Sequence, residues 1–188
     1  MKYFFLFSLA LCLLACETSE PKVSTTLFDV KPTYEPYQKV LNKNSRSTTV
    51  FSNYESLYML NVAGFTPEFY DAFTSALKER LRSTDMLVDI RTNSSFFVSI
   101  FSPNEEYNDL SNPKLWEFIL TVDGKEYKSK LVKKIKDREA WTSFFTFMNR
   151  WSNEFLIVFE IPETDGVPEN AKRALSLSTS KVKTQMIW

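Results

Sequence analysis

The dipeptide Asp123-Gly124 limits how this chain can fold more than any other feature, because it lies between two runs of strand-forming residues, Leu115–Val122 and Lys125–Val132. A two-residue Asp-Gly connection favours a type I′ turn, in which both residues adopt positive φ. The twist of that turn matches the twist of two antiparallel strands. The sequence therefore predicts a β-hairpin over residues 115–132.

The hairpin register also brings opposite charges together. Glu117 meets Lys130 on one face, and such a cross-strand pair stabilises a hairpin. On the other face the predicted pairs are Trp116 with Leu131, Phe118 with Ser129, and Leu120 with Tyr127. Turn chemistry and charge placement therefore agree on one register.

The rest of the chain contains further short runs of β-branched and aromatic residues, which are typical of strands. These runs are Ser47–Ser52, Leu57–Ala63, Phe96–Phe101, Phe155–Ile161, Leu175–Ser178 and Val182–Trp188. Strands and helices do not alternate as they do in a parallel sheet, and 188 residues suit one domain. We expect a mainly β fold, a two-layer antiparallel β-sandwich that is immunoglobulin-like in outline.

One amphipathic helix is predicted at about 66–83. Thr66 is a good N-cap, and Pro67 suits the first turn. The apolar face of this helix comprises Phe69, Phe73, Ala76, Leu77 and Leu81. Residues 137–151 combine helical spacing of aromatic residues with strand-like alternation at Phe145-Thr146-Phe147. We favour a short helix followed by an irregular turn for that segment.

The N-terminus has the organisation of a signal peptide. Lys2 is followed by thirteen uncharged residues, Tyr3 to Ala15. A helix of that length reaches about 20 Å, which is too short for a hydrocarbon core of about 30 Å. The segment has the length of the apolar region of a signal peptide.

The end of this segment, Leu13-Leu14-Ala15-Cys16, resembles the lipobox of bacterial lipoproteins. The resemblance covers residues 1–16 and implies that Cys16 receives a diacylglycerol on its sulfur and becomes the acylated N-terminus after cleavage. The alternative is an ordinary signal peptide, or an anchor, that contains Cys16. In lipoproteins of many Gram-negative bacteria, Asp after the lipidated Cys favours retention in the inner membrane. Glu17 therefore favours the outer membrane.

Three parts follow from this interpretation: a signal peptide at 1–15, a lipidated N-terminus and tether at 16–45, and a single β-sandwich domain at 46–188. A flexible chain of the tether's length spans about 30 Å. The tether also contains apolar residues, among them Tyr37 and Leu41. Part of it can therefore dock on the domain.

Composition excludes several kinds of chemistry. The chain has no His, which rules out Ser-His-Asp and Cys-His catalysis and the commonest zinc sites. Cys12 leaves with the signal peptide, so the mature chain has no free thiol. Basic and acidic residues number 23 each, without a basic excess for nucleic acid. We expect no cofactor, no metal and no nucleic-acid partner, and we expect contact with the membrane through acyl chains on Cys16.

Two local motifs have an ordinary structural interpretation. Ser75-Ala76-Leu77-Lys78 matches the S-x-x-K of penicillin-interacting enzymes, but S-D-N and K-T-G do not accompany it. Ser75 and Lys78 are better interpreted as the solvated face of the helix. The oxygen-rich run Asn104–Asp109 could suit Ca²⁺, but it lacks the spacing of an EF-hand and is better interpreted as a polar turn.

The candidate interaction surface consists of four lysines and two tryptophans: Lys128, Lys130, Lys133, Lys134, Trp141 and Trp151. The lysines could contact anionic lipid, lipopolysaccharide or an acidic partner. The favoured interpretation is that they protect an edge strand from aggregation. The two tryptophans lie in the least regular segment, whereas most other aromatic residues alternate as core residues do.

The sequence leaves three classes of function open. The leading one is a membrane-tethered, non-enzymatic structural or protein-interaction module of the cell envelope. The second is a glycan- or peptide-binding envelope module, which an exposed aromatic groove would favour. The third is a carboxylate-dependent hydrolase, which two buried and facing carboxylates would favour.

Overall fold

A computed structural model of the chain describes residues 34–52, 54–80, 84–162, 165, 168 and 171–188. Contacts divide the chain into residues 1–32 and the unit Thr33–Trp188, and the described residues belong to the second. The predicted signal peptide, Cys16 and the first part of the predicted tether lie outside the described residues.

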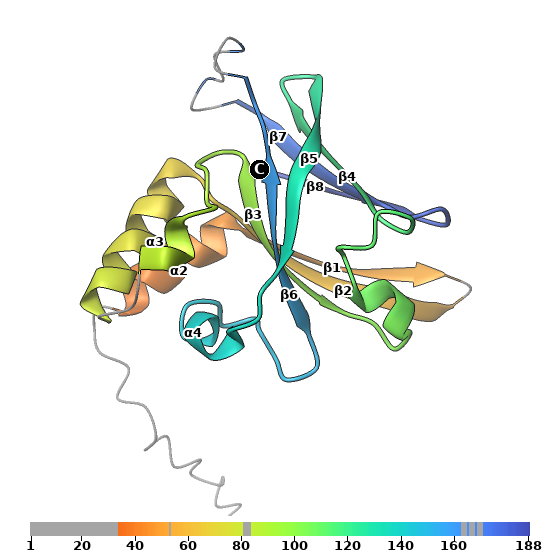
Figure 1. Cartoon of the computed structure of the whole chain (residues 1–188), viewed down its shortest axis with the longest axis horizontal. Coiled ribbons are helices and arrows are strands. Elements are labelled where there is room, and N and C mark those ends of the chain that lie inside the picture. Colours follow the sequence, from red (N-terminus) through yellow and green to blue (C-terminus); the bar gives the residue numbers. More distant parts are fainter. Residues whose placement is uncertain (1–33, 53, 81–83, 163–164, 166–167, 169–170) are drawn as a thin grey trace, which may run out of the picture. The chain divides into compact units, whose positions relative to one another are not determined.

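The described residues form eight strands, each of which overlaps a predicted run (Figure 1). The strands are β1 (Ser45–Ser52), β2 (Glu55–Gly64), β3 (Ser95–Phe101), β4 (Glu117–Val122), β5 (Lys125–Lys134), β6 (Asn153–Phe159), β7 (Arg173–Ser178) and β8 (Lys183–Ile187). All pairings between neighbouring strands are antiparallel. The predicted mainly β, antiparallel fold is therefore confirmed.

The strands join in one sheet, in the order β1-β2-β3-β6-β5-β4-β7-β8. Strand β5 connects the two halves, because residues 125–128 pair with β4, and residues 129 and 131–134 pair with β6 across a bulge at Lys130. The sheet curls until its two end strands meet: Arg46 Nε donates to the carbonyl oxygen of Ile187 at 2.9 Å, and Trp188 Nε1 donates to that of Asn44 at 2.7 Å. The result is a nearly closed, barrel-like sheet, which is not clearly the predicted two-layer sandwich.

The hairpin turn forms as predicted, but only part of the predicted register does. Asp123 and Gly124 have φ of 48° and 89°, and Leu120 pairs with Tyr127. The predicted partners of Trp116 and Phe118 are wrong, because β5 leaves β4 after Lys128 and crosses to β6. The pairs formed there are Ser129 with Phe159 and Leu131 with Val158. The predicted Glu117–Lys130 contact is also wrong: Glu117 pairs with Lys128, and Lys130 with Glu160.

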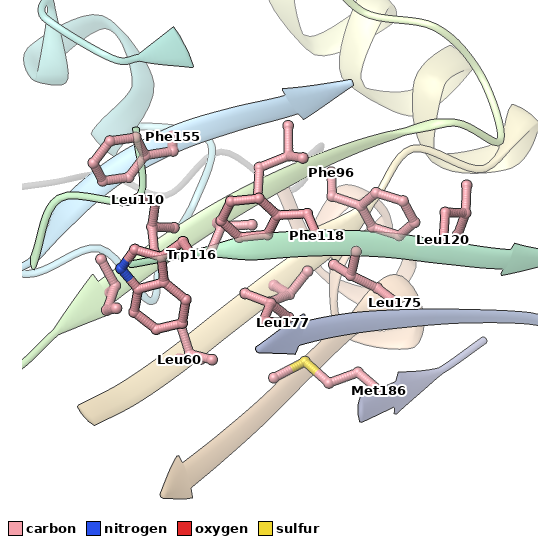
Figure 2. Packing of buried hydrophobic residues seen from close by; sticks show 14 of the residues in the cluster. Leu60, Phe96, Leu110, Trp116, Phe118, Leu120, Phe155, Leu175, Leu177 and Met186 are labelled. Carbon is pink, nitrogen blue, oxygen red and sulfur yellow. The ribbon is translucent and has the colours of Figure 1, made fainter. Parts of the chain in front are cut away.

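The inner face of the curled sheet carries one of two apolar cores. Alternate residues of the strands point inward, as period-two alternation requires. Figure 2 shows Leu60 from β2, Phe96 from β3, Phe118 from β4 and Leu175 from β7 packed together. This core connects the two halves of the sheet.

The second core lies on the outer face, under three helices: α2 (Tyr34–Asn44), α3 (Pro67–Glu79) and α4 (Arg138–Thr142) (Figure 1). The N-cap of α3 is Thr66, whose hydroxyl accepts the backbone N–H of Phe69 at 3.2 Å. Phe69, Phe73, Ala76 and Leu77 are buried, as predicted, whereas Leu81 lies outside the described residues. The short helix predicted within 137–151 is α4.

Helix α2 lies inside the segment predicted to be a tether. It buries Tyr37 and Leu41, and the Tyr37 ring lies 6.1 Å from that of Phe69 and 6.3 Å from that of Phe144. These two side chains belong to the outer core, as expected for a part of the segment that docks on the domain. No helix among the described residues has the length and hydropathy needed to cross a membrane.

Candidate functional site

The outer face of β2, β3 and β6 is apolar under the helices and becomes polar where the helices no longer cover it. Ala63, Phe97 and Leu156 form a row across the three strands and are buried in the outer core. Two residues along each strand, the next row on the same face is polar: Asn61, Ser99 and Glu154. This polar row begins a part of the sheet that the helices leave uncovered.

A pocket of about 240 Å³ lies over this uncovered part. Its lining combines apolar and neutral polar side chains: Met59, Asn61, Ser99, Phe101, Asn149, Trp151 and Ser152. Met59 pairs with Phe101, and Asn61 with Ser99, so these four residues are neighbours on the same face of β2 and β3. Trp151 is 64% exposed and Met59 45% exposed.

Trp151 is held by a tight turn between α4 and β6. The side-chain oxygen of Asn149 accepts the backbone N–H groups of Trp151 at 2.9 Å and Ser152 at 3.1 Å. Asn and Asp side chains commonly fix turns by bonding to backbone two residues ahead. Arg138 reaches the same turn from α4, donating Nη2 to the carbonyl oxygen of Asn149 at 2.5 Å. The backbone that presents Trp151 is therefore fixed at several points.

The turn is also fastened to the sheet through Glu154. The carboxylate of Glu154 is fully buried and accepts from Arg138 Nε at 2.5 Å. It also accepts from the hydroxyls of Ser152 and Ser99, the latter at 3.4 Å. A buried carboxylate is tolerated only when paired and hydrogen-bonded, and both conditions are met here. The negative charge beneath the pocket is therefore compensated.

The two predicted tryptophans have opposite environments. Trp151 lines the pocket and is exposed, and its place on an interaction surface stays a prediction. Trp141 is buried, and its ring stacks 5.3 Å from Phe97 and 5.9 Å from Phe73. Helical spacing places Trp141 on the packed side of α4, so it belongs mainly to the core.

The predicted lysines are exposed, but most of them have acidic partners. Lys128 pairs with Glu117, Lys130 with Glu160, and Lys133 with Asp89. Lys133, Lys134 and Trp141 share a second groove of about 730 Å³, whose lining also includes Asp85, Asp89 and Asp137. The mixed charges of this groove give no uniformly positive surface. The edge-strand interpretation holds only in part: β5 lies between β6 and β4 in the sheet order, but each half of it is paired on one side alone.

The two local motifs have the expected structural roles. Ser75 and Lys78 lie on the exposed face of α3. In the run 104–109, the side-chain oxygens of Asn104 and Asn108 accept the backbone N–H groups of Glu106 at 3.0 Å and Ser102 at 2.7 Å. Within the described residues, no group of three or more His, Cys, Asp or Glu could hold a metal ion.

Sequence reasoning missed Met59, Asn61 and Phe101. They become a site only through strand pairing and the position of the Trp151 turn, neither of which is a local property. A usable signal was the single charge Glu154 at the start of an otherwise apolar strand, since such a charge needs a partner from another segment.

The carboxylate arrangement that would favour a hydrolase is not found among the described residues. Glu154 is the only Asp or Glu in that part of the chain with a buried side chain, and Arg138 binds it. An aspartic-protease dyad, in contrast, places two carboxylates in one site.

Comparisons with known proteins do not assign a family. No protein-family model and no solved structure matches the chain. A stretch of 100 residues is 32% identical to the aspartic proteinase yapsin-7 of Saccharomyces cerevisiae (strain ATCC 204508 / S288c). The match covers 51% of this chain and 17% of yapsin-7, so the chain spans about a sixth of that protein's length.

Proposed function

We propose that this chain is a lipid-anchored, non-enzymatic binding module of the bacterial cell envelope. The attachment is supported by the motif Leu13–Cys16 at the end of a thirteen-residue uncharged segment. Acyl chains on Cys16 hold the chain at the membrane, because each buried CH₂ contributes about 0.8 kcal/mol. Glu17 favours the outer membrane over the inner one.

The observation that carries the binding role is the exposed Trp151 on its fixed turn beside the pocket. Large aromatic side chains are usually buried, and those that project from a rigid support are typical of binding surfaces. A fixed platform loses little conformational entropy when a ligand binds. Trp151 therefore has the features of a preorganised contact residue.

The pocket favours a discrete ligand over a purely structural role. It gathers apolar side chains and a few polar groups in one concave place, as ligand sites do. A glycan or a peptide segment of an envelope partner satisfies this description. A carboxylate-dependent hydrolase is less well supported, because Glu154, the one buried carboxylate among the described residues, is already paired with Arg138.

The anchor can be tested with the two cysteines as a matched pair. The full chain is expressed in a bacterium with an outer membrane, and the cells are fed an alkyne-labelled fatty acid. We expect label on the wild-type chain and on Cys12→Ala, but none on Cys16→Ala. Equal labelling of Cys16→Ala and wild type would contradict lipidation at Cys16.

The binding role needs a separate test. Wild type, Trp151→Ala and Phe51→Ala are compared for the envelope material that each retains after cross-linking and purification. Phe51 is a suitable control because it is 63% exposed and does not line the pocket. We expect material to be lost with Trp151→Ala alone. Equal retention by all three forms would contradict a binding role for the pocket.

A further inference from the structure

The pocket offers an aromatic platform with a defined orientation. The guanidinium of Arg150 lies 4.5 Å from the centroid of the Trp151 ring, over one face of the indole. The same indole lines the pocket together with Met59 and Phe101. A ligand with a flat, apolar C–H face can pack on such a surface.

The platform is accompanied by neutral hydrogen-bonding groups. Within the described residues, the Asn61 side chain and the side-chain Nδ2 of Asn149 make no hydrogen bond, although both residues line the pocket. An amide provides two donors and an acceptor at once. Asn61 can offer both kinds of group, whereas Asn149 offers its Nδ2 donors, because its side-chain oxygen already accepts the N–H groups of the turn. The two amides can therefore bind the hydroxyls or the acetamido group of a ligand.

Charge and size narrow the ligand further. The lining contains no charged side chain, and the carboxylate beneath it, Glu154, is paired with Arg138. The volume of about 240 Å³ lies just below the roughly 300–1,000 Å³ of pockets that hold drug-sized molecules. The site therefore suits one uncharged ring rather than an extended or ionic group.

We propose that this pocket binds one ring of a neutral saccharide, stacked on Trp151 and hydrogen-bonded by the side-chain amides of Asn61 and Asn149. A sugar ring combines an apolar C–H face with hydroxyls around its edge, and the pocket places one aromatic surface beside neutral amides. The inference rests on the proposed binding role and names the ligand class of the same site.

The test uses the full, lipidated chain in phosphatidylcholine nanodiscs. Calorimetry and saturation-transfer NMR measure binding of two neutral probes, tri-N-acetylchitotriose and maltotriose. Two further probes are the anionic trigalacturonic acid and the uncharged capped peptide acetyl-Phe-Leu-amide. We expect at least one neutral trisaccharide to bind with a dissociation constant of about 1 mM or tighter. This affinity should not depend on salt, because no charge pair forms.

Three variants connect the binding to the pocket. Trp151→Ala should weaken it about tenfold or more, through loss of stacking and apolar contact. Asn61→Ala should weaken it about fivefold, which is typical for one lost hydrogen bond. Phe51→Ala should leave it unchanged, whereas a broad protein interface across this part of the sheet would be weakened. Thermal unfolding checks that each variant is folded.

The outcomes separate this inference from the broader proposal. If the peptide binds, Trp151→Ala abolishes that binding, and no sugar binds, the saccharide inference is overturned. The broader proposal of a binding module would still stand. Salt-dependent binding of trigalacturonic acid alone would overturn the neutral ligand. No saturable binding of either neutral trisaccharide at about ten times the expected constant would overturn the inference, whatever the cross-linking comparison gives.

Discussion

Arg138 Nε lies 2.5 Å from Glu154 Oε2, and this ion pair joins helix α4 to strand β6. The carboxylate is fully buried while the Arg138 side chain remains 37% exposed. The same guanidinium holds the backbone of Asn149, at the start of the turn that carries Trp151. One side chain, Arg138, thus stabilises the fold and positions the candidate site.

Removing Arg138 should therefore be costly. Arg138→Ala leaves the buried Glu154 carboxylate without its cation, and breaking a buried pair costs about 3–5 kcal/mol. Because Arg138 is partly exposed, we expect about 3 kcal/mol, measured by urea unfolding. Lys130→Ala is the control, since it removes the exposed partner of Glu160 and should cost less than about 1 kcal/mol. Equal losses of unfolding free energy for the two variants would show that the Arg138–Glu154 pair stabilises the protein no more than an exposed ion pair does.

The hairpin turn gives a second stability prediction. Gly124 has φ of 89°, and a Cβ at this position would meet no atom within 4 Å. Any cost of a side chain therefore comes from the backbone conformation. Gly124→Val should destabilise the protein by about 2 kcal/mol, because a β-branched residue resists positive φ. Gly124→Asn should cost less than about 1 kcal/mol, since Asn tolerates this region. Similar unfolding midpoints for Val and Asn would contradict the turn conformation.

Much of the secondary structure could be predicted because it is encoded locally. Asp123-Gly124 fixes a turn by its own φ preferences, and Thr66-Pro67 marks a helix start in the same way. Strand partners are not local. Lys128 is the last residue of β5 to pair with β4, and Ser129 is the first to pair with β6. No residue in the hairpin signals this change of partner, so the predicted register fails beyond that point.

Helix α2 was missed for a different reason. Pro36 and the polar residues around it are typical of a linker, and they outweigh the helical spacing of Tyr37 and Leu41. These two side chains stabilise the helix by packing in the outer core. That core is formed by distant segments, so it cannot be recognised from the local sequence. At the site, Trp151 could be singled out by its irregular surroundings. Its neighbour Asn61 could not, because ninety residues separate them in the chain.

Stability should fall in acid through the cluster around Asp165. Its carboxylate lies 2.6 Å from Lys125 Nζ and accepts the Tyr127 hydroxyl at 2.8 Å. The hydrogen bond from Lys125, and then that from Tyr127, lowers the pKa of Asp165 below its ordinary value. A lowered folded-state pKa means that this stabilisation is present above the unfolded pKa of about 3.9 and is lost as pH falls through the folded value.

The matching experiment compares urea midpoints at neutral pH and at a pH below the folded pKa of Asp165. Asp165→Asn should be less stable than wild type at neutral pH, and the difference should shrink in acid. In a Tyr127→Phe background, the stability difference that Asp165→Asn causes at neutral pH should be smaller than in wild type, because one of the two hydrogen bonds to the carboxylate is absent. A gap between wild type and Asp165→Asn that does not change with pH would contradict this role.

The exposed lysines of β5 should matter little for stability. Lys128 and Lys130 pair with exposed carboxylates, and such pairs contribute about 0–1 kcal/mol each. Replacing both with Gln should therefore change the free energy of unfolding by less than about 1 kcal/mol, measured by thermal and urea unfolding. It should also raise aggregation if the lysines protect the one-sided halves of β5. A soluble double variant that loses salt-dependent binding to envelope material would instead identify the lysines as a contact surface.

The central claim is that Trp151 and its pocket contact a ligand in the envelope. The most direct test places a photo-crosslinking amino acid at Met59, which lines the pocket, or at Val88, which is 64% exposed and does not line it. After irradiation of living cells, we expect a cross-linked product from position 59 that Trp151→Ala abolishes and Phe51→Ala retains. Cross-linking that is equal at both positions, or that persists in Trp151→Ala, would contradict the account.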